Sequence, residues 1–157
     1  MNRTEFFVQR LMQSLSINEP WQLGIDSIST KINVPVIFWE YGSEAVFYRN
    51  RFKIFLNKYD PPQKQWETFG HESGHVFQHS GTQNKMNLPF LQYQEHQANY
   101  FAYHFCVPTF MLNKLKGVTV YDVMNLFNVE FDFALRRLEM YQSKLYVGRI
   151  INGKRTC

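Results

Sequence analysis

The stretch His71-Glu72-Ser73-Gly74-His75 determines how the rest of the chain is interpreted. It has the pattern H-E-x-x-H, and the apolar spacing around it predicts a helix. Residues four apart on an α-helix lie about 40° apart around the axis and about one turn apart along it, so both imidazoles can reach one cation. The alternative is a pair of surface histidines beside a solvated glutamate.

Two histidines in this arrangement are half of a zinc site. A catalytic zinc takes three ligands from protein and leaves the fourth position to water. Glu72 lies beside the metal face without pointing at the ion, so it can take the proton from that water. The motif therefore predicts a Zn²⁺ site with His71 and His75 as ligands and Glu72 as the catalytic base.

A third ligand is expected on the next predicted helix. His79 is unsuitable, because it lies about 12 Å along the helix axis from His71. Glu95 follows His75 by 20 residues, which is enough for a helix end, a loop and an antiparallel return. Asn99, one turn beyond Glu95, is then placed to hydrogen-bond the second nitrogen of a zinc-bound histidine. The alternative for both is an ordinary polar helix face.

Two further histidines, His96 and His104, are weaker candidates for the third metal ligand. His96 and His104 point elsewhere on the helix if Glu95 faces the metal, so we expect them to be rim or packing histidines. From Tyr100 to Leu112 the chain has no formally charged residue. This pattern favours a central core helix over an exposed interface.

Three short runs before the motif are rich in β-branched and aromatic residues: Val34 to Tyr41, Glu44 to Tyr48 and Arg51 to Leu56. Gly42-Ser43 and Arg49-Asn50 separate them. This pattern predicts a three-stranded antiparallel meander. An edge of such a sheet beside a zinc helix can hold an extended peptide by strand addition, although a sheet that only covers the core fits equally well.

Helices are expected on both sides of these strands. Apolar residues recur at helical spacing over residues 5 to 15, and a second helix is expected from Pro20 to Ile32. Asp60-Pro61-Pro62-Gln63 predicts the start of the helix that carries the motif, which is expected to end near Gly81. Pro89 is expected to open the Glu95 helix and Val107-Pro108 to close it.

The C-terminal segment predicts a pair of helices. Thr119-Val120-Tyr121-Asp122 is a capping box for a helix that ends near Phe127, and a last helix is expected from Phe131 to Lys144. Their connection has helix-turn-helix spacing. The last helix carries Arg136 and Arg137 but also acidic residues, so structural packing and docking to a protein partner are favoured over reading of DNA.

Length and composition are those of one ordinary domain. The chain has 157 residues, two cysteines, a formal charge of +4, and 15 Phe and 9 Tyr. The cysteines form no disulfide framework, and we expect neither a signal peptide nor a membrane span. These features favour a cytoplasmic protein. The mild, scattered positive charge permits an acidic partner but does not by itself predict binding to nucleic acid.

At the residues discussed above the chain resembles the ImmA/IrrE metallopeptidases. The resemblance runs from Phe69-Gly70 and the H-E-x-x-H motif through Glu95 to Ala98-Asn99-Tyr100-Phe101-Ala102 and Val107-Pro108. One departure is Gln97, because members often carry a second glutamate there. The resemblance implies a zinc endopeptidase of the phage or mobile-element type, an antirepressor whose substrate is a helix-turn-helix repressor.

The expected fold class is α+β. A small three-stranded antiparallel sheet at about 34–56 belongs to a mostly helical, zincin-like core (1–117), which a helical tail (118–157) completes within one domain. The expected function is zinc-dependent cleavage of the repressor, which releases repressed genes. Two alternatives remain: an antirepressor that binds without cleavage and keeps a structural zinc, and a DNA-binding regulator.

Overall fold

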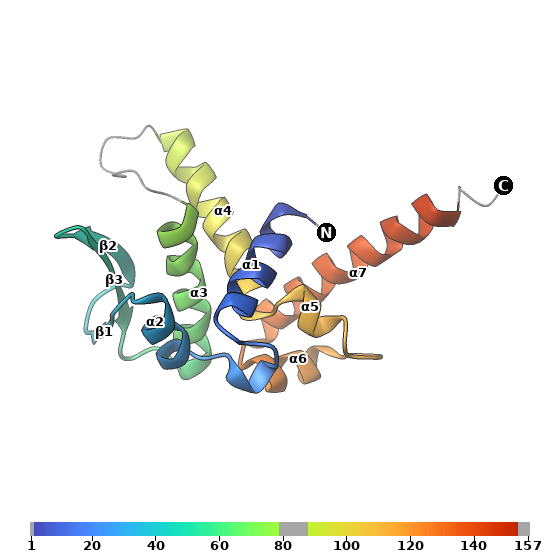
Figure 1. Cartoon of the computed structure of the whole chain (residues 1–157), viewed down its shortest axis with the longest axis horizontal. Coiled ribbons are helices and arrows are strands. Elements are labelled where there is room, and N and C mark those ends of the chain that lie inside the picture. The colour runs from blue at the N-terminus through green and yellow to red at the C-terminus, as the bar shows by residue number, and fades with distance from the viewer. Residues whose placement is uncertain (1, 79–87, 154–157) are drawn as a thin grey trace.

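A computed structural model describes residues 2–78 and 88–153 of the chain, with side chains as far as Val147. The fold is α+β and mostly helical, as predicted (Figure 1). In chain order, the elements of the described residues are α1 (Arg3–Ser14), the 3-10 turn η1 (Pro20–Gln22), α2 (Ile25–Ile32), β1 (Val36–Trp39), β2 (Glu44–Tyr48), β3 (Arg51–Asn57), α3 (Pro62–Gln78), α4 (Leu88–Cys106), α5 (Thr109–Leu112), α6 (Val120–Phe127) and α7 (Phe131–Gly153).

The sheet is mixed, so the predicted antiparallel meander is wrong in one of its pairings. Strand order is β1-β3-β2. A tight turn at Arg49 and Asn50, both with positive φ, joins β2 to β3 as an antiparallel hairpin, but β1 pairs with β3 in parallel. β3 is the longest strand, and its Ile54 and Leu56 are fully buried. The central position suits it because its backbone groups then have partners on both sides.

Two small residues bring the motif-bearing helix α3 close to α4. A Cβ at Gly74 would lie only 3.0 Å from the Ala98 Cα, and one at Gly70 would lie 2.6 Å from the Cys106 Sγ. α3 lies between the sheet and α4 (Figure 1) and makes its most extensive contacts with α4. Buried aromatic rings, including Phe69 and Phe105, fill this interface.

The helix ends follow the sequence with three differences. The helix expected from Pro20 is divided into η1 and α2, because Gly24 has an extended backbone and α2 begins after it. The short helix α5 was not predicted. α4 ends before Val107-Pro108 and Thr119 caps α6, both as expected, whereas α7 continues past Lys144. The predicted end of α3 near Gly81 falls outside the described residues.

Arg137 of α7 is buried beside the C-terminal end of α4, with 1% of its surface exposed. Its guanidinium donates to the carbonyls of Tyr103 and Val107 at 3.1 and 3.0 Å and to Thr109 Oγ1 at 2.8 Å. Thr109 in turn donates to Glu5 of α1 at 2.9 Å. Arg137 thus gives the Val107 carbonyl a donor just beyond the end of α4, and it adds a second donor to the Tyr103 carbonyl, which already accepts the Val107 N–H at 3.3 Å. The same hydrogen bonds link α1 and α7 to this end of α4.

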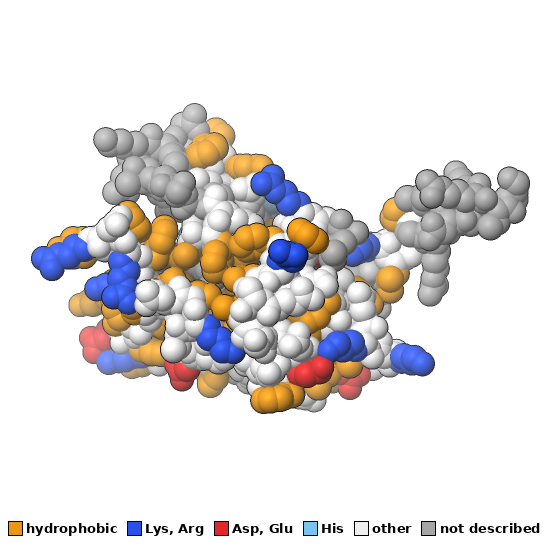
Figure 2. Space-filling view, in the orientation of Figure 1, with side chains coloured by type: hydrophobic (Ala, Val, Ile, Leu, Met, Phe, Trp, Pro, Cys, Tyr) orange, Lys and Arg blue, Asp and Glu red, His pale blue; other side chains and the backbone are white. Residues whose placement is uncertain are grey.

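The chain has no helix, among those in the described residues, that combines the length and apolar character needed to cross a membrane. Hydrophobic and basic side chains are interspersed on the face that Figure 2 shows. The basic groups are scattered over this face and do not gather in one continuous patch.

Candidate metal centre

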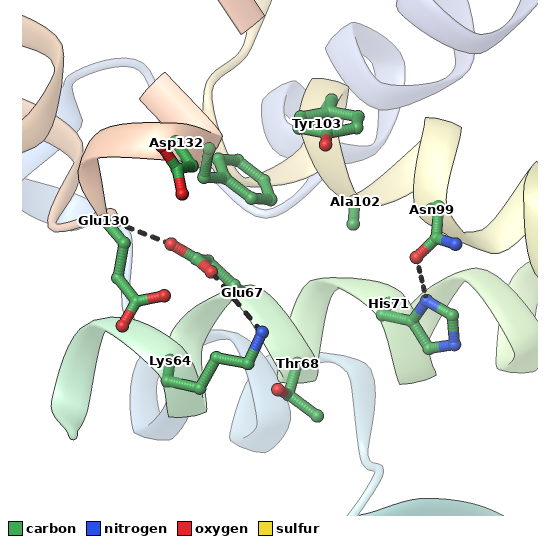
Figure 3. A pocket seen from close by; sticks show the side chains of 10 residues that line it. Lys64, Glu67, Thr68, His71, Asn99, Ala102, Tyr103, Glu130 and Asp132 are labelled. Carbon is green, nitrogen blue, oxygen red and sulfur yellow. Dashed lines mark hydrogen bonds and ion pairs between the residues drawn. The ribbon is translucent and has the colours of Figure 1, made fainter. Parts of the chain in front are cut away.

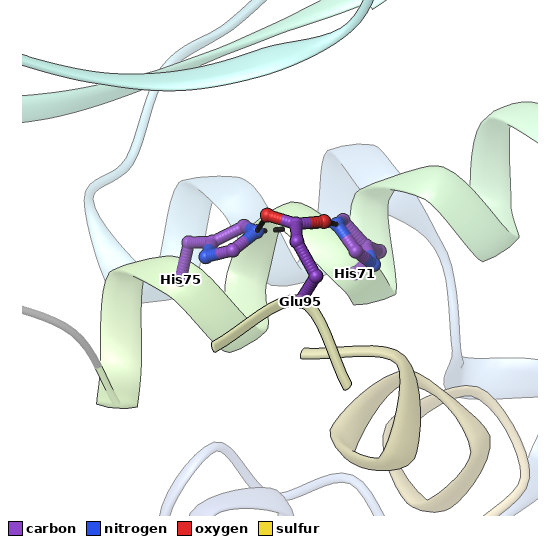
Figure 4. A group of neighbouring side chains, drawn as sticks. All are labelled: His71, His75 and Glu95. Carbon is purple, nitrogen blue, oxygen red and sulfur yellow. Dashed lines mark hydrogen bonds and ion pairs between the residues drawn. The ribbon is translucent and has the colours of Figure 1, made fainter. Parts of the chain in front are cut away.

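Three predicted ligands from two helices lie together at one end of the α3 and α4 interface (Figure 4). Glu95 Oε2 is 3.2 Å from His71 Nε2, and Glu95 Oε1 is 3.1 Å from His75 Nε2. The two imidazole Nε2 atoms are 3.1 Å apart. The histidine side chains are 20% and 11% exposed and that of Glu95 is 50% exposed, so the group is open to solvent on the Glu95 side.

The donor set of this group fits Zn²⁺. Ligand atoms about 2.1 Å from a tetrahedral ion are about 3.4 Å apart, close to the separations found here. Two imidazole nitrogens that face one another at 3.1 Å with lone pairs repel unless a cation or a proton lies between them. Two nitrogens and a carboxylate are also the ligands of many catalytic zinc sites.

Asn99 fixes the orientation of His71 from the facing helix. Its Oδ1 lies 2.8 Å from His71 Nδ1. Because an amide oxygen only accepts, the proton belongs on Nδ1, and His71 Nε2 then presents its lone pair toward Glu95. The structure thus places Asn99 in the contact that the sequence predicts for it.

Glu72 is buried on the side of α3 that faces β2, with 7% of its surface exposed. Burial raises the pKa of its carboxyl to about 7, although a hydrogen bond from the Ala45 backbone opposes the shift; the negative charges of Glu95 and Glu44 raise the pKa further. The carboxyl is therefore close enough to Glu95 to feel its charge, yet it is not among the three clustered ligand atoms. This placement suits a proton acceptor better than a ligand.

The hairpin geometry explains how β2 reaches Glu72. Tyr48 and Arg51 close a two-residue turn, so alternate residues of β2 exchange hydrogen bonds with β3. Ala45 and Phe47 occupy the other positions, where backbone groups point away from β3. Ile54, opposite Ala45, accordingly donates to the Pro35 carbonyl on the β1 side at 2.9 Å. β2 is thus an edge strand, and its outward-facing Ala45 backbone reaches Glu72 beside the candidate ligands.

The other polar residues considered from the sequence lie outside this group. His96 is exposed, and His104 is buried against Tyr100 with ring centroids 4.8 Å apart, so His104 is a packing histidine. Gln97 donates to the Tyr93 hydroxyl at 2.7 Å. His79 lies outside the described residues. Among the described residues, His71, His75 and Glu95 form the one cluster with metal-ligand spacing.

Sequence reasoning missed Glu67, one helical turn before His71. It is 6% exposed, and its Oε1 accepts the backbone N–H of Glu130 at 2.6 Å. The signal available was the spacing of Lys64, Glu67 and His71 on one face of the helix, which predicts a row of polar residues but not its burial under α7.

The fold and the site define an H-E-x-x-H protein with a glutamate from a second helix. The profile of the IrrE N-terminal-like domain, peptidase family M78, matches residues 30–139. The chain is 36% identical over 149 residues to the phage-like element PBSX protein XkdA of Bacillus subtilis (strain 168), covering 92% of this chain and 75% of XkdA. It is 31% identical to the uncharacterized protein YqaB of the same organism, covering 90% of this chain and 85% of YqaB. The chain belongs to the IrrE N-terminal-like peptidase family.

A solved structure has the same fold. The Mycobacterium tuberculosis transcriptional regulator superposes with a TM-score of 0.64 over 88% of this chain and 46% of its own length. The two sequences are only 14% identical, so this likeness concerns the fold.

Proposed function

We propose that this protein is a zinc-dependent endopeptidase that cleaves a helix-turn-helix transcriptional repressor in the cytoplasm and so releases phage or mobile-element genes. The observation that carries the proposal is the convergence of His71, His75 and Glu95 with a buried Glu72 beside them. Membership of a peptidase family and likeness to a phage-element protein support it.

In this proposal His71, His75 and Glu95 hold the metal, and Asn99 keeps His71 in the tautomer that can bind. Zn²⁺ would supply Lewis acidity, which polarises a scissile carbonyl and lowers the pKa of water toward about 7. Glu72 accepts the proton of the attacking water and passes it to the leaving amine. The Ala45 backbone contact orients the Glu72 carboxylate for this transfer.

The edge strand β2 would hold the substrate. A peptide segment added beside β2 finds the Ala45 carbonyl and the Phe47 N–H and carbonyl pointing away from β3, whereas the Ala45 N–H is already donated to Glu72. Its scissile bond then lies between β2 and the metal ligands. An unfolded or extended segment of the repressor suits this geometry better than a helix, because only an extended backbone can pair with a strand.

Burial of Arg137 argues against the DNA-binding alternative. α7 carries two adjacent arginines. The Arg137 guanidinium is buried and donates to the Val107 carbonyl beyond the end of α4, and Arg136 pairs with Glu139 at 3.3 Å. Neither of these two arginines is therefore a free cation, whereas DNA binding depends on neutralising phosphates. The non-proteolytic antirepressor remains the competing function that experiment must separate.

The test combines metal content with cleavage of the repressor encoded beside the gene. We expect one zinc per chain in the wild type, in Glu72→Gln and in the control Gln97→Ala, and loss of zinc in Glu95→Ala. Wild type should cut the repressor, and Glu72→Gln should bind it without cutting. Cleavage by Glu72→Gln would refute the mechanism. If wild type and Glu72→Gln both relieve repression and neither cleaves the repressor, the antirepressor that acts by binding alone would be established.

A further inference from the structure

A pocket of about 340 Å³ adjoins the metal centre (Figure 3). His71 and Asn99 form one end of it, and the first residues of α7 form the other. Its floor is the face of α3 that carries Glu67, about 6 Å along the helix axis from His71. The volume lies at the small end of ligand pockets and suffices for one long side chain. We call this space the Glu67 pocket.

The Glu67 pocket is acidic. Its walls carry the carboxylates of Glu67, Glu130 and Asp132 and one amine, that of Lys64. Glu67 is buried, and burial raises the pKa of its carboxyl to about 7. Buried carboxylates are rare unless they have a cationic or hydrogen-bonding partner, because desolvation penalises the charged form. The pocket thus brings three carboxyl groups and one amine together beside the candidate metal centre.

The Glu67 carboxylate has one strong contact with backbone and two weaker ones, with the carboxyl of Glu130 and the amine of Lys64. Oε1 accepts the Glu130 N–H at 2.6 Å and so holds the start of α7. Oε2 has Lys64 Nζ at 4.0 Å, too far for a hydrogen bond, and the Lys64 side chain is 50% exposed. An exposed pair of this kind contributes little, so Lys64 is readily displaced. Displacement of Lys64 would leave Glu67 facing a cavity that has room for a cationic ligand.

We propose that the Glu67 pocket receives an arginine or lysine side chain of the protein substrate, next to the scissile bond. The proposal rests on the endopeptidase function above and names the specificity of the same site. A peptide held at the metal centre places side chains beside His71, and a long cationic one reaches Glu67 Oε2 within one helical turn. Charge-assisted hydrogen bonds to a partly buried carboxylate are stronger than neutral ones, so Glu67, Glu130 and Asp132 would select a cation.

A binding experiment tests the pocket without any cleavage. The full chain, labelled with ¹⁵N, is titrated with Nα-acetyl-arginine amide and with the neutral analogue Nα-acetyl-citrulline amide. We expect the arginine compound to shift the amide signals of Thr68, Glu130 and Asp132, and the citrulline compound to bind at least about tenfold more weakly, a difference of about 1.4 kcal/mol. Equal binding of the two compounds, or shifts confined to other regions, would overturn the proposal.

Three variants make the assignment specific. Glu67→Gln keeps an oxygen to accept the Glu130 N–H but removes the charge, so it should lose the preference for arginine. Lys64→Gln removes the competing amine and should tighten binding of the arginine compound. Glu139→Gln removes an exposed carboxylate of α7 outside the pocket and should change nothing. An unchanged arginine preference in Glu67→Gln would contradict the proposal.

Cleavage kinetics then connect the pocket to the reaction. Peptides that span the repressor cleavage site are compared with variants in which the nearest arginine or lysine is replaced by glutamine. We expect kcat/KM of the wild type to fall at least about tenfold, and Glu67→Gln to cleave both peptides alike. Failure of all cleavage with a normal arginine titration would count against the proposed function alone. Cleavage without a cationic preference would count against the pocket alone.

Discussion

His71 Nδ1 and Asn99 Oδ1 meet at 2.8 Å across the interface between α3 and α4. This hydrogen bond fixes which ring nitrogen of His71 carries the proton, and hence which one can bind a metal. Replacing Asn99 by alanine should weaken zinc affinity by about 10- to 100-fold, as is typical of lost contacts behind a metal ligand. Competition with a chromophoric chelator measures this. Gln97→Ala is the control on the same helix, and equal zinc affinity in the two variants would contradict the assigned role of Asn99.

The close approach of Gly74 to Ala98 sets the distance from the histidines to Glu95. In Gly74→Ala the new methyl group would meet the Ala98 Cα at 3.0 Å and its carbonyl oxygen at 3.3 Å, so the helices must separate. We expect a loss of about 1–3 kcal/mol of stability and weaker zinc binding. Chemical denaturation and zinc titration check both effects.

Gly42→Ala is the matched control for this substitution, because a Cβ at Gly42 meets nothing within 4 Å. Its stability and zinc affinity should equal those of the wild type. A Gly74→Ala protein that also behaves as wild type would show that the helix spacing does not limit the site.

Thr109 connects Arg137 to Glu5, donating to Glu5 and accepting from Arg137. Thr109→Val keeps the shape but leaves buried polar partners unsatisfied, so we expect a loss of about 1–3 kcal/mol. Thr30→Val, at an exposed site of α2, should stay within about 0.5 kcal/mol of the wild type. Urea unfolding of the two variants measures the difference, and equal midpoints would mean that the connection contributes nothing.

Glu67 should make stability depend on pH near neutrality. Burial raises the pKa of its carboxyl from 4.5 to about 7 in the folded protein. Between these values the folded state binds more protons than the unfolded state, so stability falls as pH rises and levels off above about 7. The glutamine of Glu67→Gln cannot titrate. The free energy of unfolding of this variant, relative to that of the wild type, should therefore increase from pH 4.5 to 7. Parallel stability curves for the two proteins over this range would contradict the assigned pKa.

The metal cluster was predictable because its spacing is local to each helix. His71 and His75 are four apart, and Glu95 and Asn99 are four apart, so each pair shares a helix face whatever the rest of the fold. A short connection then favours antiparallel pairing of the two helices. This is enough to bring four side chains together without knowledge of the sheet.

The strand order and the Glu67 pocket were not predictable in the same way. The β-branched and aromatic residues of β1 indicate a strand but not which strand it pairs with. In the structure β1 pairs in parallel with β3, whose Ile54 and Leu56 are fully buried at the centre of the sheet. Glu67 contacts Glu130 across 63 residues of sequence. A glutamate between Lys64 and His71 is typical of a solvated helix face, and only the position of α7 buries it.

The buried contact of Arg137 limits which C-terminal segments this chain can acquire in evolution. Arg137 belongs to the helical pair from residue 118, and its guanidinium cannot be withdrawn from the end of α4 without leaving the Val107 carbonyl without its donor. An exchange of C-terminal segments between related genes would therefore succeed only when the incoming segment brings its own donor to this place. Inheritance of the two parts is coupled by this contact, together with those of Glu130 with Glu67 and of Lys144 with Glu5.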